Sequence, residues 1–368
     1  MNFVSLFSGC GGLDLGVVQA GFMPLFSVEW DPHASDSLKA WSEKEGFNHP
    51  VMVQDVRTLT PEEILATTHL KSGELDLLVG GPPCQAFSAI GKRQGLADER
   101  GLLLFEMIRF AQVIQPRAML IEQVKGLTNI RIEESGRLAL DVFLEQLQKL
   151  GYSANSKVLK AVDYGVPQMR ERLFIVAFKE GYEYQFPDPQ YTDPTKADMF
   201  AKPYVTIKEA LQGLPDPELK NSEHEPLVPN HIDVTPDRDR ERIHGVPEGE
   251  WLSKQLHLPE SQRRNLGKKD TTKYRRLHSD QPSLTLRGGE IFFHPFKDRY
   301  LTPREYLRIH GYPDWFELRG PVRSRSGTYK KLDQHRQVAN SVPPPLAKVL
   351  ASSIKATLER NTHLVESF

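Results

Sequence analysis

Short apolar runs alternate with amphipathic stretches along the first half of the chain. The runs predict strands at 3–7, 25–29, 51–53, 75–79 and 118–121, and a hairpin formed by 153–161 and 173–178. The stretches 13–20, 102–114 and 138–150 predict helices, the last two because apolar residues recur there at helical spacing. This alternation predicts an α/β fold with a doubly wound, mainly parallel sheet and the hairpin near its edge.

The sequence pattern changes near Phe186. Prolines then follow in quick succession as far as Pro229, and the alternation of strands and helices fades until a helical pattern returns at 344–358. A chain of 368 residues is also long enough for two packed units. We therefore predict a larger domain at 1–185, a smaller loop-rich domain at 186–320, and a C-terminal segment at 321–368 that packs back onto the larger domain.

Composition narrows the class of protein. The chain is 39% hydrophobic and 26% charged, as soluble globular proteins are, and its net charge of −1 gives no overall basic signature of nucleic-acid binding. Cys10 and Cys84 are the only cysteines, too few for a disulfide framework or a zinc site built on several thiolates. With so few cysteines, we predict no metal and a reducing compartment. The start lacks a signal-peptide pattern, and no apolar run approaches the roughly 18 residues of a membrane span, so we predict a cytoplasmic, nucleoid-associated location.

Three successive predicted strands end in residues that suit a nucleoside cofactor. The first leads into a glycine-rich turn at 7–16, where the backbone can approach a ligand closely. The second ends at Glu29 and Trp30, which suit ribose hydroxyls and an adenine ring, and Asp55 after the third can accept a bond from an adenine amino group. Each feature alone is about equally compatible with a structural role. Together they indicate a nucleoside, without separating NAD from S-adenosylmethionine.

A single cysteine follows the strand predicted at 75–79. Pro82 and Pro83 stiffen the chain just before Cys84, which places a thiol at the carboxyl end of a strand. A thiolate with a lowered pKa would be a strong nucleophile there. A buried, inert cysteine is the alternative, and it is the commoner fate of a lone cysteine.

The order of these motifs resembles that of the DNA (cytosine-5)-methyltransferases. The matching blocks lie at 7–12, 29–31, 83–85, 122–124, 168–172, 299–305 and 337–343, and they cover most of the chain except roughly 186–280. One residue departs from the family pattern, because Gln123 stands where the family usually has asparagine. The resemblance implies that this amide helps to seat the catalytic loop, so the longer side chain puts the rate or the loop position in question.

The resemblance implies a Rossmann-like methyltransferase that moves a methyl group from S-adenosylmethionine to C5 of a flipped cytosine in duplex DNA, leaving S-adenosylhomocysteine. Cys84 would attack C6 of the ring, and Glu122 would bond N3 and the exocyclic amine. Arg172 and Arg170 would neutralise charge at O2. The alternatives are a strand-end salt bridge for Glu122 and surface pairing with Glu171 for the arginines.

The resemblance also divides the chain by role, with catalysis in 1–185 and target recognition in 186–320. It assigns the cofactor to a set of residues drawn from the strand ends and from the C-terminal block. These residues are Phe7, Gly9, Gly11, Gly12, Leu13, Glu29, Trp30, Asp55, Val56, Pro82, Asn340 and Ser341.

Basic residues concentrate between 261 and 278, which gives the local charge segregation that the whole chain lacks. They are Arg263, Arg264, Lys268, Lys269, Lys273, Arg275 and Arg276, against only Asp270. Phosphate contacts and guanine recognition by one or two arginines are as probable here as a solvated charged face. Further DNA contacts are predicted at Thr285 and in the loop after the cysteine, where Ile90 is a candidate to fill the hole left by the flipped base; the loop residues are Gln85, Ser88, Ile90, Lys92 and Arg93.

Double-stranded DNA is the predicted partner, with a restriction endonuclease encoded elsewhere as a second candidate. The nearest rival is a tRNA methylase of the same architecture, which the resemblance disfavours because that branch carries a further cysteine in its recognition region, and no cysteine follows Cys84. A catalytically silent DNA-binding relative would be expected to have lost Cys84 or Glu122. A nicotinamide oxidoreductase would explain neither the Pro-Pro-Cys-Gln block nor the last two blocks.

Overall fold

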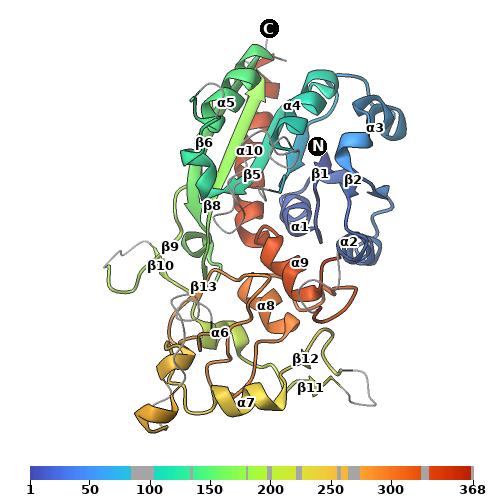
Figure 1. Cartoon of the computed structure of the whole chain (residues 1–368). Helices are drawn as coiled ribbons and strands as arrows, with labels where there is room; N and C mark the ends of the chain where they lie inside the picture. Colours follow the sequence, from blue (N-terminus) through green and yellow to red (C-terminus); the bar gives the residue numbers. More distant parts are fainter. Residues whose placement is uncertain are drawn as a thin grey trace. The chain divides into compact units, whose positions relative to one another are not determined.

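The computed structural model describes residues 1–83, 103–132, 136–179, 181–196, 201–220, 226–254, 258–263, 274–324 and 331–365. Contacts within the chain divide it into two compact units (Figure 1). The first comprises Met1–Lys160, Glu171–Asp188 and Val342–Phe368, and the second comprises Ala161–Arg170 and Pro189–Ser341. Residues 161–170 and 321–341 thus group with the second unit, whereas the sequence placed them outside the smaller domain.

The first unit is built on a seven-stranded sheet in the order β3-β2-β1-β4-β5-β8-β6. Its strands are β1 (Asn2–Leu6), β2 (Met23–Glu29), β3 (Val51–Val53), β4 (Leu77–Gly80), β5 (Ala118–Val124), β6 (Tyr152–Lys160) and β8 (Glu171–Lys179). The pairs from β3 to β5 are parallel, and β8 runs antiparallel to both β5 and β6. The predicted mainly parallel sheet with a hairpin at one edge is therefore confirmed.

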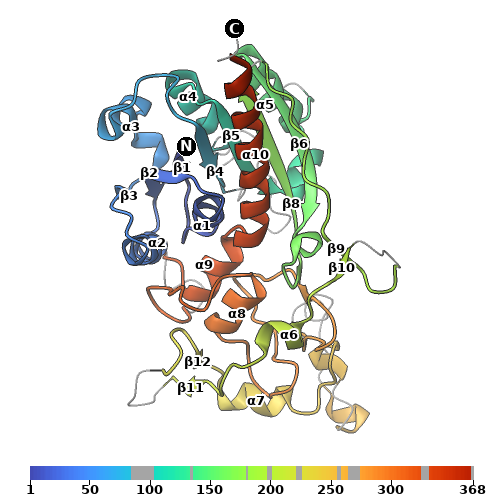
Figure 2. The same cartoon turned by 180° about the vertical axis from the view of Figure 1, so that it is seen from behind.

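Helices cover the sheet because each has an apolar side to bury. They are α1 (Gly12–Gln19), α2 (Pro32–Lys44), α3 (Pro61–Thr68), α4 (Leu103–Ile114), α5 (Ala139–Lys149) and α10 (Pro344–Val365). Helix α10 runs in front of the sheet in Figure 2 and packs along α1. That packing is close, since a Cβ on Gly16 would overlap the side chain of Ala347. Central strands β1, β4 and β5 are buried along most of their length, as parallel strands covered on both faces should be.

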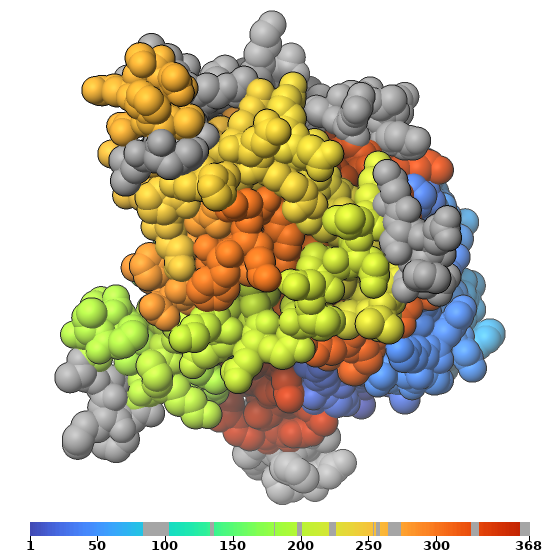
Figure 3. All heavy atoms as spheres, turned by 90° about the horizontal axis from the view of Figure 1, so that it is seen from below, coloured from blue at the N-terminus to red at the C-terminus, as the bar shows by residue number. Residues whose placement is uncertain are grey.

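The second unit has short elements joined by long loops. They are η4 (Ala161–Tyr164), β7 (Gln168–Met169), β9 (Tyr191–Thr192), β10 (Lys202–Pro203), α6 (Ile207–Leu211), β11 (Glu218–Leu219), β12 (Ile232–Asp233), α7 (Asp237–Ile243), η5 (Leu252–Lys254), η6 (Glu260–Gln262), β13 (Ser283–Leu284), α8 (Pro303–Ile309) and α9 (Gln334–Asn340). Figure 3 shows one face of it, where the yellow segment that includes α7 borders the orange segment that leads into α8. Frequent prolines explain the shortness of these elements, because proline cannot donate to a sheet or within a helix.

Candidate active site

The glycine-rich turn between β1 and α1 adopts backbone conformations that favour glycine. Gly9 and Gly11 have φ of 58° and 90°, and even Phe7 adopts a φ of 56°. A Cβ on Gly11 would overlap the indole of Trp41 in α2, whereas a Cβ on Gly9 would meet nothing within 4 Å. Gly11 is therefore required by packing, and Gly9 leaves open space over the turn where a ligand can approach.

Glu29, the last residue of β2, ties its strand to this turn. Its Oε2 accepts a hydrogen bond from Gly9 N at 2.8 Å, and its Oε1 accepts one from Asp31 N at 2.8 Å. The side chain is buried, and this burial raises its pKa above the ordinary value for a glutamate. Each carboxylate oxygen can accept a further bond, so the pair can still receive two ribose hydroxyls.

Trp30 and Asp55 lie at the ends of the neighbouring strands β2 and β3. Trp30 is 68% exposed, which is unusual for a tryptophan and leaves its ring accessible for stacking. Asp55 caps the short helix η1 (Val56–Thr58) and is held by Arg57, whose Nη2 donates at 2.7 Å. The hydrogen bonds from the Arg57 side chain hold the pKa of Asp55 below its usual value. An adenine amino group would have to share this carboxylate with Arg57.

These strand ends fit a nucleoside better than a phosphate. The turn offers open space at Gly9, a buried carboxylate at Glu29 and an exposed indole at Trp30. A phosphate site needs unpaired backbone N–H groups and positive charge, but Gly9 N is already bonded to a carboxylate. The open space at Gly9, the acceptor carboxylate of Glu29 and the exposed Trp30 ring therefore fit an adenosine-containing cofactor.

Glu122 and Arg172 form an ion pair at the ends of two central strands. Arg172 Nε lies 2.8 Å from Glu122 Oε1, and only 10% of the Glu122 side chain and 18% of the Arg172 side chain are exposed. The strands β5 and β8 set this geometry, because Val124 lies opposite Arg172 in their register. Glu171 pairs with Lys125 at 3.0 Å instead, so the surface pairing considered for Arg172 is not what the structure has.

The same strand end lies beside the segment that leads to Cys84. A Cβ on Gly81 would lie 3.6 Å from Glu122 Oε2, so this carboxylate faces the backbone three residues before the cysteine. The neighbouring Gln123 is buried, and its Nε2 donates to Pro82 O at 2.8 Å. Gln123 therefore anchors the start of this loop, while its own Oε1 is buried without a hydrogen-bond partner.

The predicted nucleophile and the loop after it fall outside the described residues. This holds for Cys84, Gln85, Ser88, Ile90, Lys92 and Arg93. In the basic stretch it also holds for Arg264, Lys268, Lys269 and Lys273. Their roles stay predictions.

Arg170 differs from Arg172 in its surroundings. It is 1% exposed, and its Nη1 and Nη2 donate to the carbonyls of Ala339 and Ser341 at 2.9 and 3.0 Å. These carbonyls belong to the C-terminal end of α9, where helix carbonyls lack intrahelical partners. The guanidinium thus caps a helix, and this placement does not favour the contact with cytosine O2 predicted for Arg170.

The described residues of the basic stretch have different environments. Arg276 is 5% exposed, and its Nη2 donates to Asp298 Oδ1 at 2.5 Å and to Ile243 O at 2.9 Å, so it braces the fold and is poorly placed to read a guanine. Arg275 stacks on the Trp251 ring at 4.5 Å and donates to Gly249 O. Arg263 donates through Nε to Leu258 O at 3.0 Å, and the Thr285 hydroxyl donates to Met169 O at 2.7 Å.

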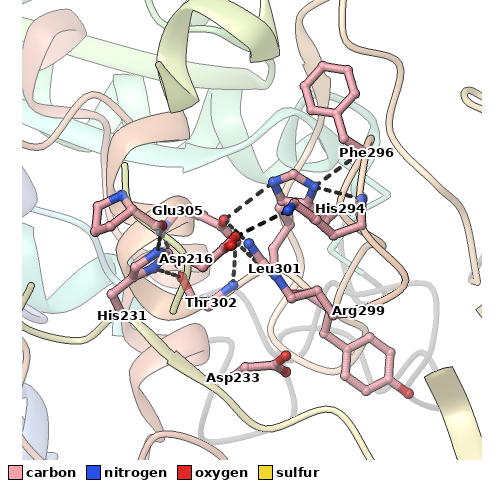
Figure 4. A network of polar contacts seen from close by, with 12 residues as sticks. Asp216, His231, Asp233, His294, Phe296, Arg299, Leu301, Thr302 and Glu305 are labelled. Carbon is pink, nitrogen blue, oxygen red and sulfur yellow. Dashed lines mark hydrogen bonds and ion pairs between the residues drawn. The ribbon is translucent and has the colours of Figure 1, made fainter. Parts of the chain in front are cut away.

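The block at 299–305, known from the sequence only as a family match, forms a buried polar network (Figure 4). Arg299 donates to both carboxylate oxygens of Glu305 at 2.8 and 2.7 Å, and Thr302 N donates to the same carboxylate at 2.8 Å. Burial would raise the pKa of Glu305, but the bonds from Arg299 hold it below the usual value. Burial lowers the pKa of the neighbouring His294 to about 4, so that histidine is neutral at pH 7. The block at 299–305 is thus a framework of the second unit.

A second buried carboxyl lies beneath the glycine-rich turn. Asp14 receives hydrogen bonds from Ser5 Oγ at 2.9 Å and Ser27 Oγ at 3.1 Å. Burial raises its pKa to about 7. The signal in the sequence was an aspartate in an otherwise apolar helical run, at 13–18.

Neither a membrane-spanning helix nor a metal-binding cluster is found in the described part of the chain. No helix there is long and apolar enough to cross a membrane. The described residues also contain no group of three or more His, Cys, Asp and Glu side chains that could hold a metal ion.

The sequence of the chain matches a known protein family. Residues 1–356 match the family of C-5 cytosine-specific DNA methylases. The Type II methyltransferase M1.HphI of Haemophilus parahaemolyticus is 35% identical over 99% of this chain and 88% of its own length. The Type II methyltransferase M.PspPI of a Psychrobacter strain is 35% identical over 96% of this chain and 78% of its own length.

Solved structures agree in fold. An Escherichia coli prophage protein described as a DNA modification methyltransferase superposes with a TM-score of 0.72 at 25% identity, covering 98% of this chain and 99% of its own. The Dnmt2 methyltransferase of S. pombe gives a TM-score of 0.60 at 18% identity over 98% of this chain and 99% of its own, which shows the fold alone. The sheet is that of the Rossmann-like methyltransferases, and the chain belongs to the C-5 cytosine-specific DNA methylases.

Proposed function

We propose that this protein methylates C5 of a cytosine flipped out of duplex DNA, through a covalent bond between Cys84 and C6. The observation that carries the proposal is the Glu122–Arg172 pair, held at 2.8 Å beside the loop that begins at Gly81 and Pro82. A carboxylate fixed at this place, with its partner arginine, can bind the polar edge of a cytosine. A stacked base is out of reach of such a site, which is why flipping is part of the proposal.

The chemistry follows from the poor nucleophilicity of C5. Attack of the Cys84 sulfur on C6 breaks the aromaticity of the ring and leaves C5 enamine-like. Glu122 would hold N3 and the exocyclic amine as charge develops, and Arg172 orients that carboxylate through Nε while it neutralises charge at O2. Once C5 carries the methyl group, loss of the C5 proton and of the thiolate restores the aromatic ring.

The first unit would hold S-adenosylmethionine, which supplies an electrophilic methyl group when bound. Glu29 would bind the ribose hydroxyls and Trp30 would stack on adenine, as their burial and exposure suit. Asp55 would share its carboxylate between Arg57 and the adenine amino group. Asn340 and Ser341 are proposed on the resemblance of their block.

The relatives support the proposed substrate. Both relatives named above are Type II methyltransferases, which supports DNA as the substrate. A cognate restriction endonuclease encoded elsewhere is part of the proposal. The DNA-contacting residues are proposed to include Arg263, Arg275 and Thr285, with the basic residues of 264–273.

Bisulfite sequencing of mixed-sequence duplex DNA after incubation with the protein and S-adenosylmethionine tests the proposal. We expect protected cytosines within one short sequence, and none with Cys84→Ala. Duplex containing 5-fluorocytosine should trap a covalent adduct, because fluorine cannot leave as a proton does. Methylation of transfer RNA in place of duplex DNA would move the substrate to RNA, and turnover without an adduct would refute the covalent step.

A further inference from the structure

The chain leaves the second unit for the first directly after Arg170 and again directly after Ser341. These two exits are tied together by one buried side chain. Arg170, the last residue before the first exit, donates to the carbonyl of Ser341, the last residue before the second, at 3.0 Å. It also donates to Ala339 O at 2.9 Å. Neither exit can therefore move within the second unit without disturbing the other.

A second chain of hydrogen bonds reaches the same carbonyl. Leu286 N donates to Gln168 Oε1 at 3.0 Å, which turns the amide nitrogen of Gln168 towards His310 Nδ1 at 2.9 Å. Because that amide nitrogen is a donor, Nδ1 must accept, and the proton of the neutral imidazole lies on Nε2. His310 Nε2 then donates to Ser341 O at 3.0 Å. Gln168 and His310 are both fully buried, so these bonds are shielded from water.

Strand β7, which carries Gln168, pairs with β13, which lies in the segment predicted to meet DNA. In the register of β7 and β13, Ser283 lies opposite Gln168 and Leu284 lies opposite Met169. The Thr285 hydroxyl donates to Met169 O at 2.7 Å. A displacement of 283–286 therefore acts directly on Gln168, and through His310 on Ser341.

Each exit leads within a few residues to the catalytic or cofactor elements of the first unit. Two residues after Arg170, Arg172 holds Glu122. Shortly after Ser341, α10 begins and packs along α1, so closely that Gly16 has no room for a side chain. Helix α1 itself begins in the glycine-rich turn.

We propose that Gln168, Arg170 and His310, with the carbonyls of Ala339 and Ser341 (the exit cluster), couple DNA binding at 283–286 to cofactor binding in the first unit. These three side chains act as positioning residues, since each acts through backbone that it holds. The inference rests on the proposed function and deepens it. By linkage, DNA must raise cofactor affinity by the same factor as the cofactor raises DNA affinity.

The coupling factor is measured as the ratio of the Kd values of S-adenosylhomocysteine without and with a duplex that carries the methylated sequence found by bisulfite sequencing. For the wild type we expect a ratio of about 5 or more, the lower end for coupled sites. His310→Phe replaces the imidazole by another aromatic ring and so removes both hydrogen bonds. We expect the coupling factor of this variant to fall below about 2. The Kd of S-adenosylhomocysteine alone should change little, because the side chains of Gln168, Arg170 and His310 are not proposed to touch the cofactor.

His231→Phe is the matched control. His231 is also a buried histidine of the second unit, and its ring is bonded to Thr302 Oγ1 at 2.8 Å and Pro215 O at 2.9 Å, neither of which lies at an exit. Its loss should lower thermal stability and leave the coupling factor unchanged. If His310→Phe does not fold, His310→Gln, whose amide can still donate to Ser341 O, should give an intermediate factor.

Two results would overturn the coupling. One is a wild-type protein that methylates DNA with a coupling factor near one, and the other is an equal loss in the His310 and His231 variants. A wild type that methylates no duplex at all would instead remove the proposed function, so the two failures are distinguishable.

Discussion

Arg172 Nε lies 2.8 Å from Glu122 Oε1, and the two side chains come from neighbouring antiparallel strands of the sheet. The pair explains how a carboxylate at the end of β5 can be held in one orientation. A planar guanidinium fixes the plane of a carboxylate better than a lysine ammonium can. In the proposed mechanism, Arg172 would therefore act through Glu122 as well as through direct contact with the base.

Glu122→Gln should lower the single-turnover rate of methyl transfer by about 10²- to 10³-fold, the usual loss when one stabilising group is removed from a transition state. Arg172→Lys should lower it less, because the charge remains and only the directed Nε bond is lost. Cofactor binding, measured by calorimetry, should be unchanged in both. Lys125→Met breaks the neighbouring pair with Glu171 and serves as the control, and a comparable rate loss there would argue against a special role for Glu122.

Glu29→Ala should weaken S-adenosylmethionine binding by about 1.5–3 kcal/mol, the range for hydrogen bonds to a charged group. The variant removes the acceptor for ribose and also the bond to Gly9 N that holds the turn. Glu29→Gln retains an acceptor oxygen and should lose less. Calorimetric titrations that show wild-type affinity in the alanine variant would refute the ribose assignment.

Gln123→Leu should slow methyl transfer without unfolding the protein. The substitution removes the bond to Pro82 O, which anchors the start of the loop that carries Cys84, and it also relieves the buried, unpartnered Oε1. Gln123→Asn should keep activity if the shorter amide still reaches Pro82 O. An inactive but folded asparagine variant would show that the longer side chain has a dedicated role.

Arg299→Met should destabilise the protein by about 3–5 kcal/mol, because it leaves the buried Glu305 carboxylate without its partner. Lys149→Met provides the contrast, since the Lys149–Glu145 pair is largely exposed and its loss should cost far less stability. Urea unfolding of both variants measures the difference. Similar losses would mean that the buried pair adds nothing beyond a surface pair.

The Asp14 carboxyl should make stability depend on pH. Its pKa in the folded protein is raised by burial to about 7, above the usual 3.8, so its stabilising contribution is present below about pH 4 and is lost as pH rises through about 7. Between these values Asp14→Asn, which mimics the protonated acid, should gain on the wild type by up to about 1.4 kcal/mol per pH unit. Burial also raises the pKa of Glu29 and lowers that of His49 to about 4, but the variant retains both residues, so the difference between the two proteins isolates Asp14. A difference that stays constant from pH 4 to 7 would show that Asp14 is ionised in the fold.

The sequence by itself determined the sheet and the ends of its strands. Short, continuous apolar runs predict β1, β2, β4 and β5, because a parallel strand that is buried on both faces is apolar along its length. Helices α2 and α3 were not predicted, since α2 buries Leu38 and Trp41 among serines and its apolar pattern is faint. The glycine-rich turn and Glu29 were placed together because strand ends of a parallel sheet share one edge.

Only the tertiary structure decided which charged side chains are engaged within the fold. Arg170 and Arg172 are two residues apart in one motif, yet Arg170 caps α9 and Arg172 holds Glu122. Arg276 belongs to a basic run that suggested DNA, but its guanidinium is buried against backbone carbonyls and Asp298. A sequence records which residues carry charge, whereas their partners come from segments far along the chain, and the desolvation and hydrogen bonds that fix each role exist only once those segments pack together.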